Sequence, residues 1–203
     1  MQIVYANQSE LHSPNSNWPI SIFLAGPTPR SAKVESWRPE FIEELQYSRS
    51  EKINNATIFV PEQNKDKWQD EYIDQVEWEW NHLMAADIVV FWVPRELETM
   101  PAFTTNIEFG LMIGLDKKIV VGWPLYTPKM GYYEWHLKRT NRKFHHTIGE
   151  MIDIIDFHAE LIDIRGQDEK TEYRRMNCGL YSKKISNLPS TKDFSRSTPE
   201  PNP

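Results

Sequence analysis

Two glutamates are the side chains of this sequence best placed to take part in chemistry. Glu108 comes after an apolar run, residues 87–93, and a polar loop. We expect a helix to begin at Asn106, a good N-cap residue, which puts Glu108 in its first turn. Glu79 lies in an otherwise apolar stripe of the preceding predicted helix. A carboxylate at such a position needs a polar or charged partner, or it has a functional role. A carboxylate near a helix start, at the carboxyl edge of a parallel sheet, lies where α/β proteins bind their ligands.

Several other kinds of site are excluded by their missing motifs. The sequence has no Walker loop, no G-x-G-x-x-G after a strand, no H-E-x-x-H and no G-x-S-x-G. His145, His146 and His158 lack companions at metal-ligand spacing, and Cys178 is the single cysteine. We therefore expect no metal site, no cofactor and no internal disulfide framework. The remaining candidates are the carboxylates and a Gly-Pro-Thr loop that begins at Gly26.

Four short apolar runs predict the strands that position these residues: 20–25, 57–60, 87–93 and 118–123. Runs of this length and composition are typical of strands buried on both faces of a parallel sheet. We expect helices from near Ser36, from about residue 70 to 86, from Asn106, and from Thr147 to about His158. Residues 124–144 are expected to be irregular. The alternation of strands and helices predicts an α/β fold, with a doubly wound parallel sheet in an α/β/α sandwich.

Hydrophobic spacing predicts which helix faces are buried. Helical spacing gives the first helix one apolar face and the second helix one stripe. The face of the first helix consists of Trp37, Phe41 and Leu45, and the stripe of the second consists of Tyr72, Val76, Glu79, Leu83 and Ala86.

We expect three parts along the chain. Residues 1–19 form an N-terminal edge strand, at Gln2–Ala6, and a loop. Residues 20–165 form the main domain, in which 161–164 are a last strand or an extension. Residues 166–203 form a polar C-terminal extension that is partly disordered or docked on a neighbour. The net charge of −6 speaks against broad binding to nucleic acid polymers or anionic membranes. The N-terminus is unlike a signal peptide and no stretch suits a membrane span, so we expect a cytoplasmic protein.

Four segments, in order, carry a resemblance to a known family. They are residues 22–27 (IFLAGP), Trp78-Glu79 shortly before Asp87, residues 86–95 (ADIVVFWVPR) and residues 104–110 (TTNIEFG). In order and spacing they resemble the nucleoside 2-deoxyribosyltransferase family, and most closely its branch with a TTN-x-E-F-G segment. The resemblance covers about residues 21–123.

The resemblance implies a flavodoxin-like sheet and cleavage of the N-glycosidic bond of a nucleoside or nucleotide. Glu108 would attack C1′ of the sugar to form a covalent glycosyl-enzyme, which a free nucleobase or water then resolves; Glu79 would be the acid/base near the departing base. The first loop would line the sugar or 5′ end, where Arg30 or backbone amides could hold a phosphate. The expected substrate-binding residues are Gly26, Pro27, Thr28, Arg30, Asp87, Trp92, Arg95, Thr104, Thr105 and Asn106. A homo-oligomer is expected, because family members usually complete their site from a neighbouring subunit.

Two positions depart from the family pattern. The tyrosine that orients the nucleophile in the classical enzymes falls at Phe23, and the aspartate six residues before the nucleophile falls at Ala102. Thr104 or Thr105 could take over sugar contacts. The departures weaken the expectation of the classical 2′-deoxy preference.

Each candidate residue also has a structural interpretation. Glu108 could simply interact with the helix dipole, and Glu79 could reach water at the edge of its stripe. Asp87 could cap a turn, Arg95 could be a solvated cation, and Gly26 and Pro27 could serve turn geometry, whereas Trp37 and Trp92 could belong to the core rather than stack on a base. Two functional alternatives stay open: a hydrolase of a nucleotide or NAD, and a non-catalytic nucleotide-binding or signalling module on the same fold.

Overall fold

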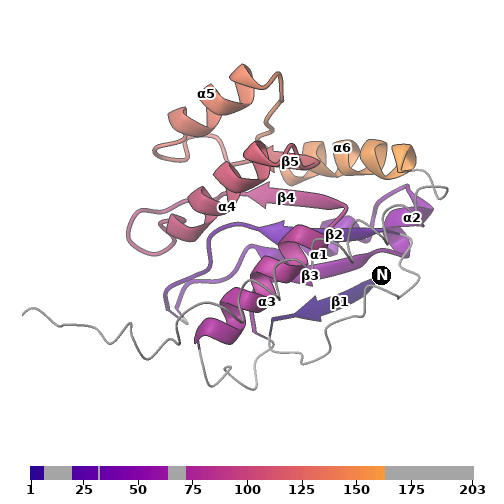
Figure 1. The fold of residues 1–203 in the computed structure, drawn as a ribbon, viewed down its shortest axis with the longest axis horizontal. Coiled ribbons are helices and arrows are strands. Elements are labelled where there is room, and N and C mark those ends of the chain that lie inside the picture. The colour runs from indigo at the N-terminus through magenta and orange to yellow at the C-terminus, as the bar shows by residue number, and fades with distance from the viewer. Residues whose placement is uncertain (7–19, 32, 64–71, 163–203) are drawn as a thin grey trace, which may run out of the picture.

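The apolar runs expected as strands lie together in one parallel sheet. The computed structural model describes residues 1–6, 20–31, 33–63 and 72–162, and its elements are drawn in Figure 1. The strands are β1 (Gln2–Tyr5), β2 (Ser21–Ala25), β3 (Thr57–Val60), β4 (Ile88–Trp92) and β5 (Ile119–Gly122); the helices are α1 (Arg38–Leu45), α2 (Glu51–Asn54), α3 (Tyr72–Ala85), α4 (Phe103–Gly114), α5 (Gly131–Arg139) and α6 (Ile148–Leu161). Every strand pair is parallel, in the order β1-β3-β2-β4-β5.

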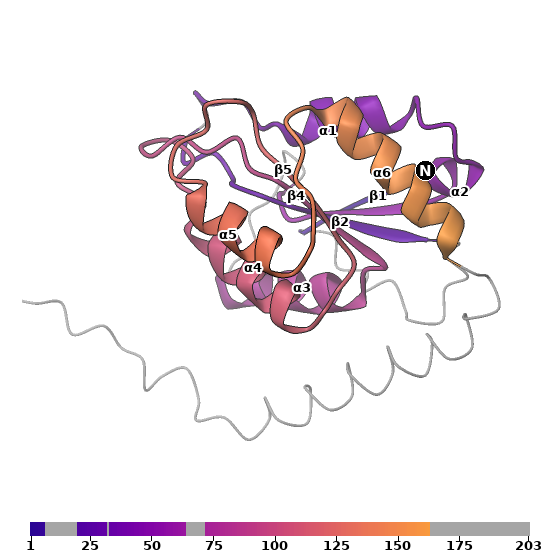
Figure 2. The same ribbon diagram turned by 90° about the horizontal axis from the view of Figure 1, so that it is seen from above.

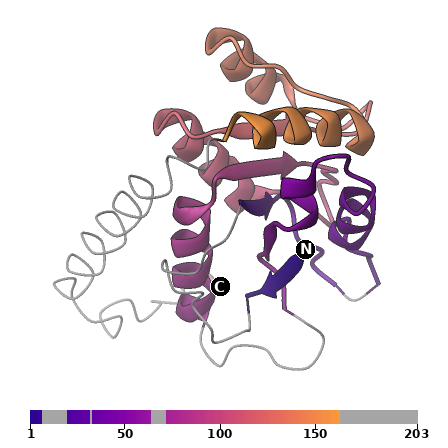
Figure 3. The ribbon, with the colours of Figure 1, turned by 90° about the vertical axis from the view of Figure 1, so that its right-hand side faces the viewer.

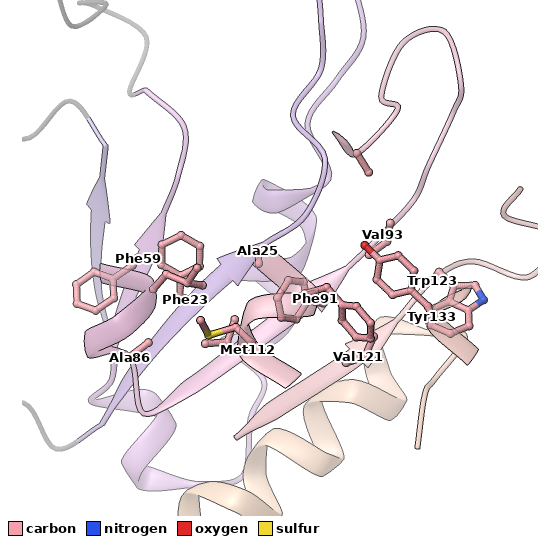
Figure 4. Packing of buried hydrophobic residues seen from close by; sticks show 14 of the residues in the cluster. Phe23, Ala25, Phe59, Ala86, Phe91, Val93, Met112, Val121, Trp123 and Tyr133 are labelled. Atoms are coloured by element: carbon pink, nitrogen blue, oxygen red, sulfur yellow. The ribbon is translucent and has the colours of Figure 1, made fainter. Parts of the chain in front are cut away.

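The two faces of the sheet are covered by different helices. Because side chains alternate along a strand, Ile22 and Leu24 of β2 join a core with α1, α2 and α6, whereas Phe23 and Ala25 join a core with α3, α4 and α5. Figure 2 shows the resulting three layers. In Figure 4 the second core runs from Phe23, beside Phe59, to Tyr133, beside Trp123. The expected α/β/α sandwich is therefore the fold that forms.

The strand order identifies the fold as flavodoxin-like. Strands β3, β2, β4 and β5 take the first four places of the 2-1-3-4-5 order, whose topological switch point then lies between β2 and β4. The fifth place holds a single parallel bridge, in which His145 pairs with Gly122. The expected edge strand near the N-terminus is present as β1, at the end of the sheet away from α5 (Figure 3).

Two expectations need correction. Residues 124–144 are not irregular throughout, because Tyr133 and Leu137 lie one helical turn apart and bury one face of α5. On α3, Val76 is exposed, and Trp78 and His82 lie in the buried face instead, because the bulky Trp78 ring packs against the sheet residues Phe23 and Phe59.

The end of α6 and the segments beyond it are only partly described. Leu161 closes α6 and does not begin a strand. Residues 163–164, the extension 166–203, and residues 70–71 before α3 lie outside the described residues. Among the described residues, none of the helices combines the length and the apolar character needed to cross a membrane.

Helix α6 has a defined start and end. Thr147 and Glu150 form a reciprocal capping box at its first turn. At its other end, Lys52 Nζ donates to the carbonyls of Ala159, Glu160 and Ile162 at 3.1, 3.2 and 3.2 Å. A cation there satisfies orphan carbonyls and interacts favourably with the helix dipole. The lysine therefore ties α2 to the end of α6.

Lys52→Met is expected to destabilise the protein by about 1–2 kcal/mol, because two half-buried carbonyls and one exposed carbonyl lose their donor. Urea unfolding measures the change. Lys138→Met is the matched control, since Lys138 forms an exposed pair with Glu134 one turn away, worth about 0.5 kcal/mol or less. Equal losses in the two variants would contradict a capping role for Lys52.

Candidate functional site

The loop that follows β2 lies at the carboxyl edge of the sheet, beside the switch point. Its first residue, Gly26, passes so close to its neighbours that an added Cβ would collide with the backbone oxygen of Trp92 and lie 2.6 Å from Trp37 Cζ2. Pro27 is buried and its carbonyl accepts from Trp37 Nε1 at 3.0 Å. Only glycine fits at this position, because any side chain would overlap the Trp92 backbone and the Trp37 ring. These contacts fix the position of the loop relative to the sheet.

Gly26→Ala is expected to cost about 1–3 kcal/mol of stability, because backbone and a packed indole must move to admit the methyl group. Gly110→Ala on α4 is the matched control: no atom lies within 4 Å of its added Cβ, so a gain of about 0.5–1 kcal/mol is expected there. Thermal unfolding distinguishes the two. A neutral Gly26→Ala would show that the loop is not packed as described.

A buried arginine organises the same loop. Arg38, 1% exposed, donates from its guanidinium to the carbonyls of Leu24 (3.1 Å) and Gly26 (2.7 Å), to the Thr28 hydroxyl (3.3 Å), and to the carboxylate of Glu62. A buried cation is stable only when its donors are satisfied in this way. Arg38 therefore fixes the loop and carries a positive charge beneath it.

Helix α4 begins earlier than the sequence suggests. Its N-cap is Ala102, in the left-handed conformation (φ 61°, ψ 39°), and the Asn106 N–H already donates to the Ala102 carbonyl at 3.1 Å. The prediction that Asn106 is the N-cap is therefore wrong. Glu108 lies in the second turn of the helix and not in the first. The helix starts where Thr105, Phe109 and Met112 can bury one face. Beyond the first turn the dipole has little effect, so it does not account for Glu108.

Asn106 has another function at this helix start. Its side-chain oxygen accepts from Arg95 Nη2 and, at 3.0 Å, from the Tyr133 hydroxyl. Arg95 also donates to the Lys129 carbonyl at 3.0 Å and lies 5.6 Å from the Tyr133 ring centre. Arg95, only 7% exposed, is thus not a solvated cation. The three side chains join the loop after β4, α4 and α5.

Glu79 and Glu108 interact electrostatically. Both are partly buried. Burial, and then repulsion by Glu79, raise the pKa of Glu108 to about 7, while Arg38 opposes the rise. Burial also raises the pKa of Glu79, opposed by a hydrogen bond from Gln75 Nε2 (2.9 Å) and by Arg38. A carboxyl group whose pKa is near neutral, beside a second carboxyl group whose pKa is also raised, can exchange a proton with a bound molecule.

The other predicted site residues fall into two groups. Thr28, Arg30 and Thr104 are exposed at the carboxyl edge, and Arg30 lies over the ring of Phe103, 5.1 Å from its centre. Asp87 is a correction: it lies at the opposite, amino edge, because it directly precedes β4. There its carboxylate accepts from the Ser21 N–H and hydroxyl at 2.9 and 2.8 Å.

Two further residues are corrections. Trp92, 6% exposed, belongs to the core with α1 and α6, since its position faces that layer; Trp37 lies in the same core, as expected from the apolar face of the first helix. Thr105 is fully buried because it faces the sheet from α4, so it does not present its hydroxyl to a sugar.

Arg38 and Tyr133 were missed by sequence reasoning. An arginine before Pro39 at a helix start resembles a solvated residue, and nothing in the sequence marks it as buried. Tyr133 could have been found from its spacing to Leu137. The position at which the classical enzymes carry tyrosine, Phe23, is fully buried against Trp78, with ring centres 6.3 Å apart.

Comparison with known proteins gives one family and a distant structural likeness. The family model described as "Nucleoside 2-deoxyribosyltransferase like" matches residues 19–126, a range that contains β2 to β5 and both glutamates. A crystal structure of a conserved protein from Enterococcus faecalis V583 is similar with a TM-score of 0.41 and 12% identity, over 66% of this chain and 87% of that chain. No curated protein matches.

Proposed function

The chain belongs to the nucleoside 2-deoxyribosyltransferase-like family, and from this premise we propose that it cleaves the N-glycosidic bond of a nucleoside or nucleotide. The observation that carries the proposal is the pair of interacting carboxyl groups, Glu108 and Glu79, beside the switch point of the sheet. Ligands of open α/β sheets bind at that point. Glycosidic chemistry with retention requires two such groups, one as nucleophile and one as acid/base.

In the first step the ionised Glu108 attacks C1′ of the sugar. A C–O bond forms, the C1′–N bond breaks, and its electron pair leaves with the base. Glu79 serves as the acid in this proposal and donates a proton to the departing base; burial raises its pKa, which favours the protonated form. The product is a glycosyl ester of Glu108 and a free nucleobase.

In the second step a new base or a water molecule attacks C1′. The ester bond breaks, Glu108 leaves as a carboxylate, and Glu79 accepts the proton of the incoming nucleophile. The Arg38 charge favours the ionised form of Glu108 in both steps. Arg30 and Thr28, exposed on the Gly26–Arg30 loop, are the groups of that loop available to a sugar or phosphate. We expect no cofactor to be needed.

The products distinguish the two outcomes of this chemistry. The protein is incubated with each common nucleoside and nucleoside 5′-monophosphate, with and without a second free base, and the bases are separated by chromatography. Release of the first base in every mixture indicates hydrolysis, and a new nucleoside only with the added base indicates transfer. Thermal stabilisation by nucleotides without base release from any of them would contradict the proposal and favour a binding module.

We also propose that the active form is a homo-oligomer. Phe103 and Ile107, 66% and 74% exposed, lie on the helix that carries Glu108. Exposed apolar residues of this size next to a site are typical of a contact surface. The mass in solution by light scattering tests this: a monomer at all concentrations would contradict it.

A further inference from the structure

Thr105 carries a buried hydroxyl for which the structure shows no partner in the described part of the chain. The residue is 0% exposed and its Oγ1 makes no hydrogen bond. A threonine in a helix usually donates to a carbonyl three or four residues earlier. Buried polar groups are rarely left unpaired in folded proteins, and each such group calls for a physical explanation.

An unpartnered acceptor lies one turn further along the same helix. Within residues 72–162 and the other described ranges, no donor is hydrogen-bonded to the Glu108 carboxyl, and burial and the repulsion by Glu79 are what raise its pKa. Residues three apart on a helix are neighbours. Long side chains on a helix lean back over the turn that precedes them. A Glu108 side chain in this usual orientation would bring its carboxyl group towards Thr105.

We propose that Thr105 is a positioning residue: its hydroxyl, which makes no hydrogen bond among the described residues, turns to donate to the Glu108 carboxylate when that group is ionised, and aims it at the substrate. This deepens the proposed function and rests on it. The hydroxyl is a weak match for a protonated carboxyl but a good donor to an ionised one, since hydrogen bonds to charged acceptors are about twice as strong as neutral ones. Thr105, being sealed from solvent, acts through Glu108 and does not touch the substrate.

The groups around Glu108 leave this donor role open. Glu79 on α3 repels the charge of Glu108. Arg38 on α1 attracts it, but the Arg38 guanidinium already donates hydrogen bonds to the loop after β2. From α5 it faces the Tyr133 hydroxyl, which donates to Asn106 together with Arg95. The Thr105 hydroxyl, three residues before Glu108 on α4, is a buried donor with no partner among the described residues.

The test separates the hydroxyl from the shape of the side chain. Thr105→Val keeps the shape and removes the donor, and Thr105→Ser keeps the donor. Thr140→Val is the matched control, since Thr140 is exposed at the end of α5 and belongs to no predicted site. In Thr105→Val we expect kcat to fall about 10–100-fold with KM unchanged, and the acid limb of the pH profile to move up by about one unit. Thr105→Ser should keep most of the activity. Equal losses in Thr105→Val and Thr105→Ser would overturn the proposal in favour of packing.

A second measurement needs no activity at all. Without its donor, ionised Glu108 is less stable, so unfolding between about pH 5 and about pH 8 should show a larger loss of stability in Thr105→Val than in the unaltered protein. The additional loss should vanish when Glu108→Gln is also present. Because Thr105→Val removes an unsatisfied group, its stability at about pH 5 should be unchanged or higher. If Thr105→Val leaves the pH dependence of stability unchanged, the role of Thr105 is overturned. If that pH dependence changes but the unaltered protein releases no base from any substrate, only the proposed function is overturned.

Discussion

Glu108→Gln is expected to lower base release or exchange by at least ~10³-fold, because the amide cannot form the ester that carries the sugar between the two steps. The substitution keeps the size of the side chain and removes the charge. Initial rates with the best nucleoside or nucleotide substrate measure the loss. Glu98→Gln, an exposed acid on the preceding loop, removes the same charge and should leave the rate unchanged.

The same variant should be more stable than the unaltered protein at alkaline pH. Folding raises the pKa of Glu108 from 4.5 to about 7, so the folded state binds more protons between these values and its stability falls as the pH rises through them. Above about pH 7 the buried charge costs about 3 kcal/mol, and below about pH 4.5 it costs nothing. Glu108→Gln avoids this cost. Loss of activity together with a gain in stability at alkaline pH would show that the substitution removed a buried charge and left the fold intact.

Two results would contradict the assignment. Full activity in Glu108→Gln would exclude Glu108 as the nucleophile. Loss of activity with reduced stability at every pH would show a packing defect instead. In the unaltered protein, a mass increase of one glycosyl group on the peptide that contains Glu108, after rapid quenching with acid, would identify the covalent intermediate directly.

Glu79→Gln is expected to lower kcat by about 10²–10⁴-fold for natural nucleosides, since the departing base loses its proton donor. Two further changes distinguish this from a structural defect. First, removal of the repelling carboxylate lowers the pKa of Glu108, so the acid limb of the pH profile moves below about 7. Second, a substrate with the same sugar and a nitrophenolate leaving group, which needs no proton, should react at nearly the normal rate.

Glu77→Gln is the matched control for this prediction. It lies on α3 two residues away, is exposed, and should change neither the rate nor the pH profile. An equal loss for both leaving groups in Glu79→Gln, with the acid limb in its original place, would assign Glu79 a structural role.

The family pattern of the sequence and its apolar runs were sufficient for the architecture. The runs at 57–60 and 20–25 predict β3 and β2 to within one residue, because a strand buried on both faces can only be apolar throughout. The alternation with helices then predicts the doubly wound order, since right-handed crossovers leave few alternatives. Glu79 was found because a carboxylate in an apolar stripe is conspicuous along the chain. Glu108 was found from its place after the central strand and from the TTN-x-E-F-G segment that resembles the family.

Only the tertiary structure decided which polar residues serve the site. Asp87 and Arg95 flank the same strand, yet parallel strands place the first at the amino edge and the second at the carboxyl edge, where contacts with Asn106 and Tyr133 bury it. Local propensity put a helix start at Asn106, but burial of Thr105 against the sheet moved it to Ala102. The burial of Arg38 and the pKa of Glu108 depend on neighbours distant in the sequence, and spacing along a chain does not encode the electrostatics of such contacts.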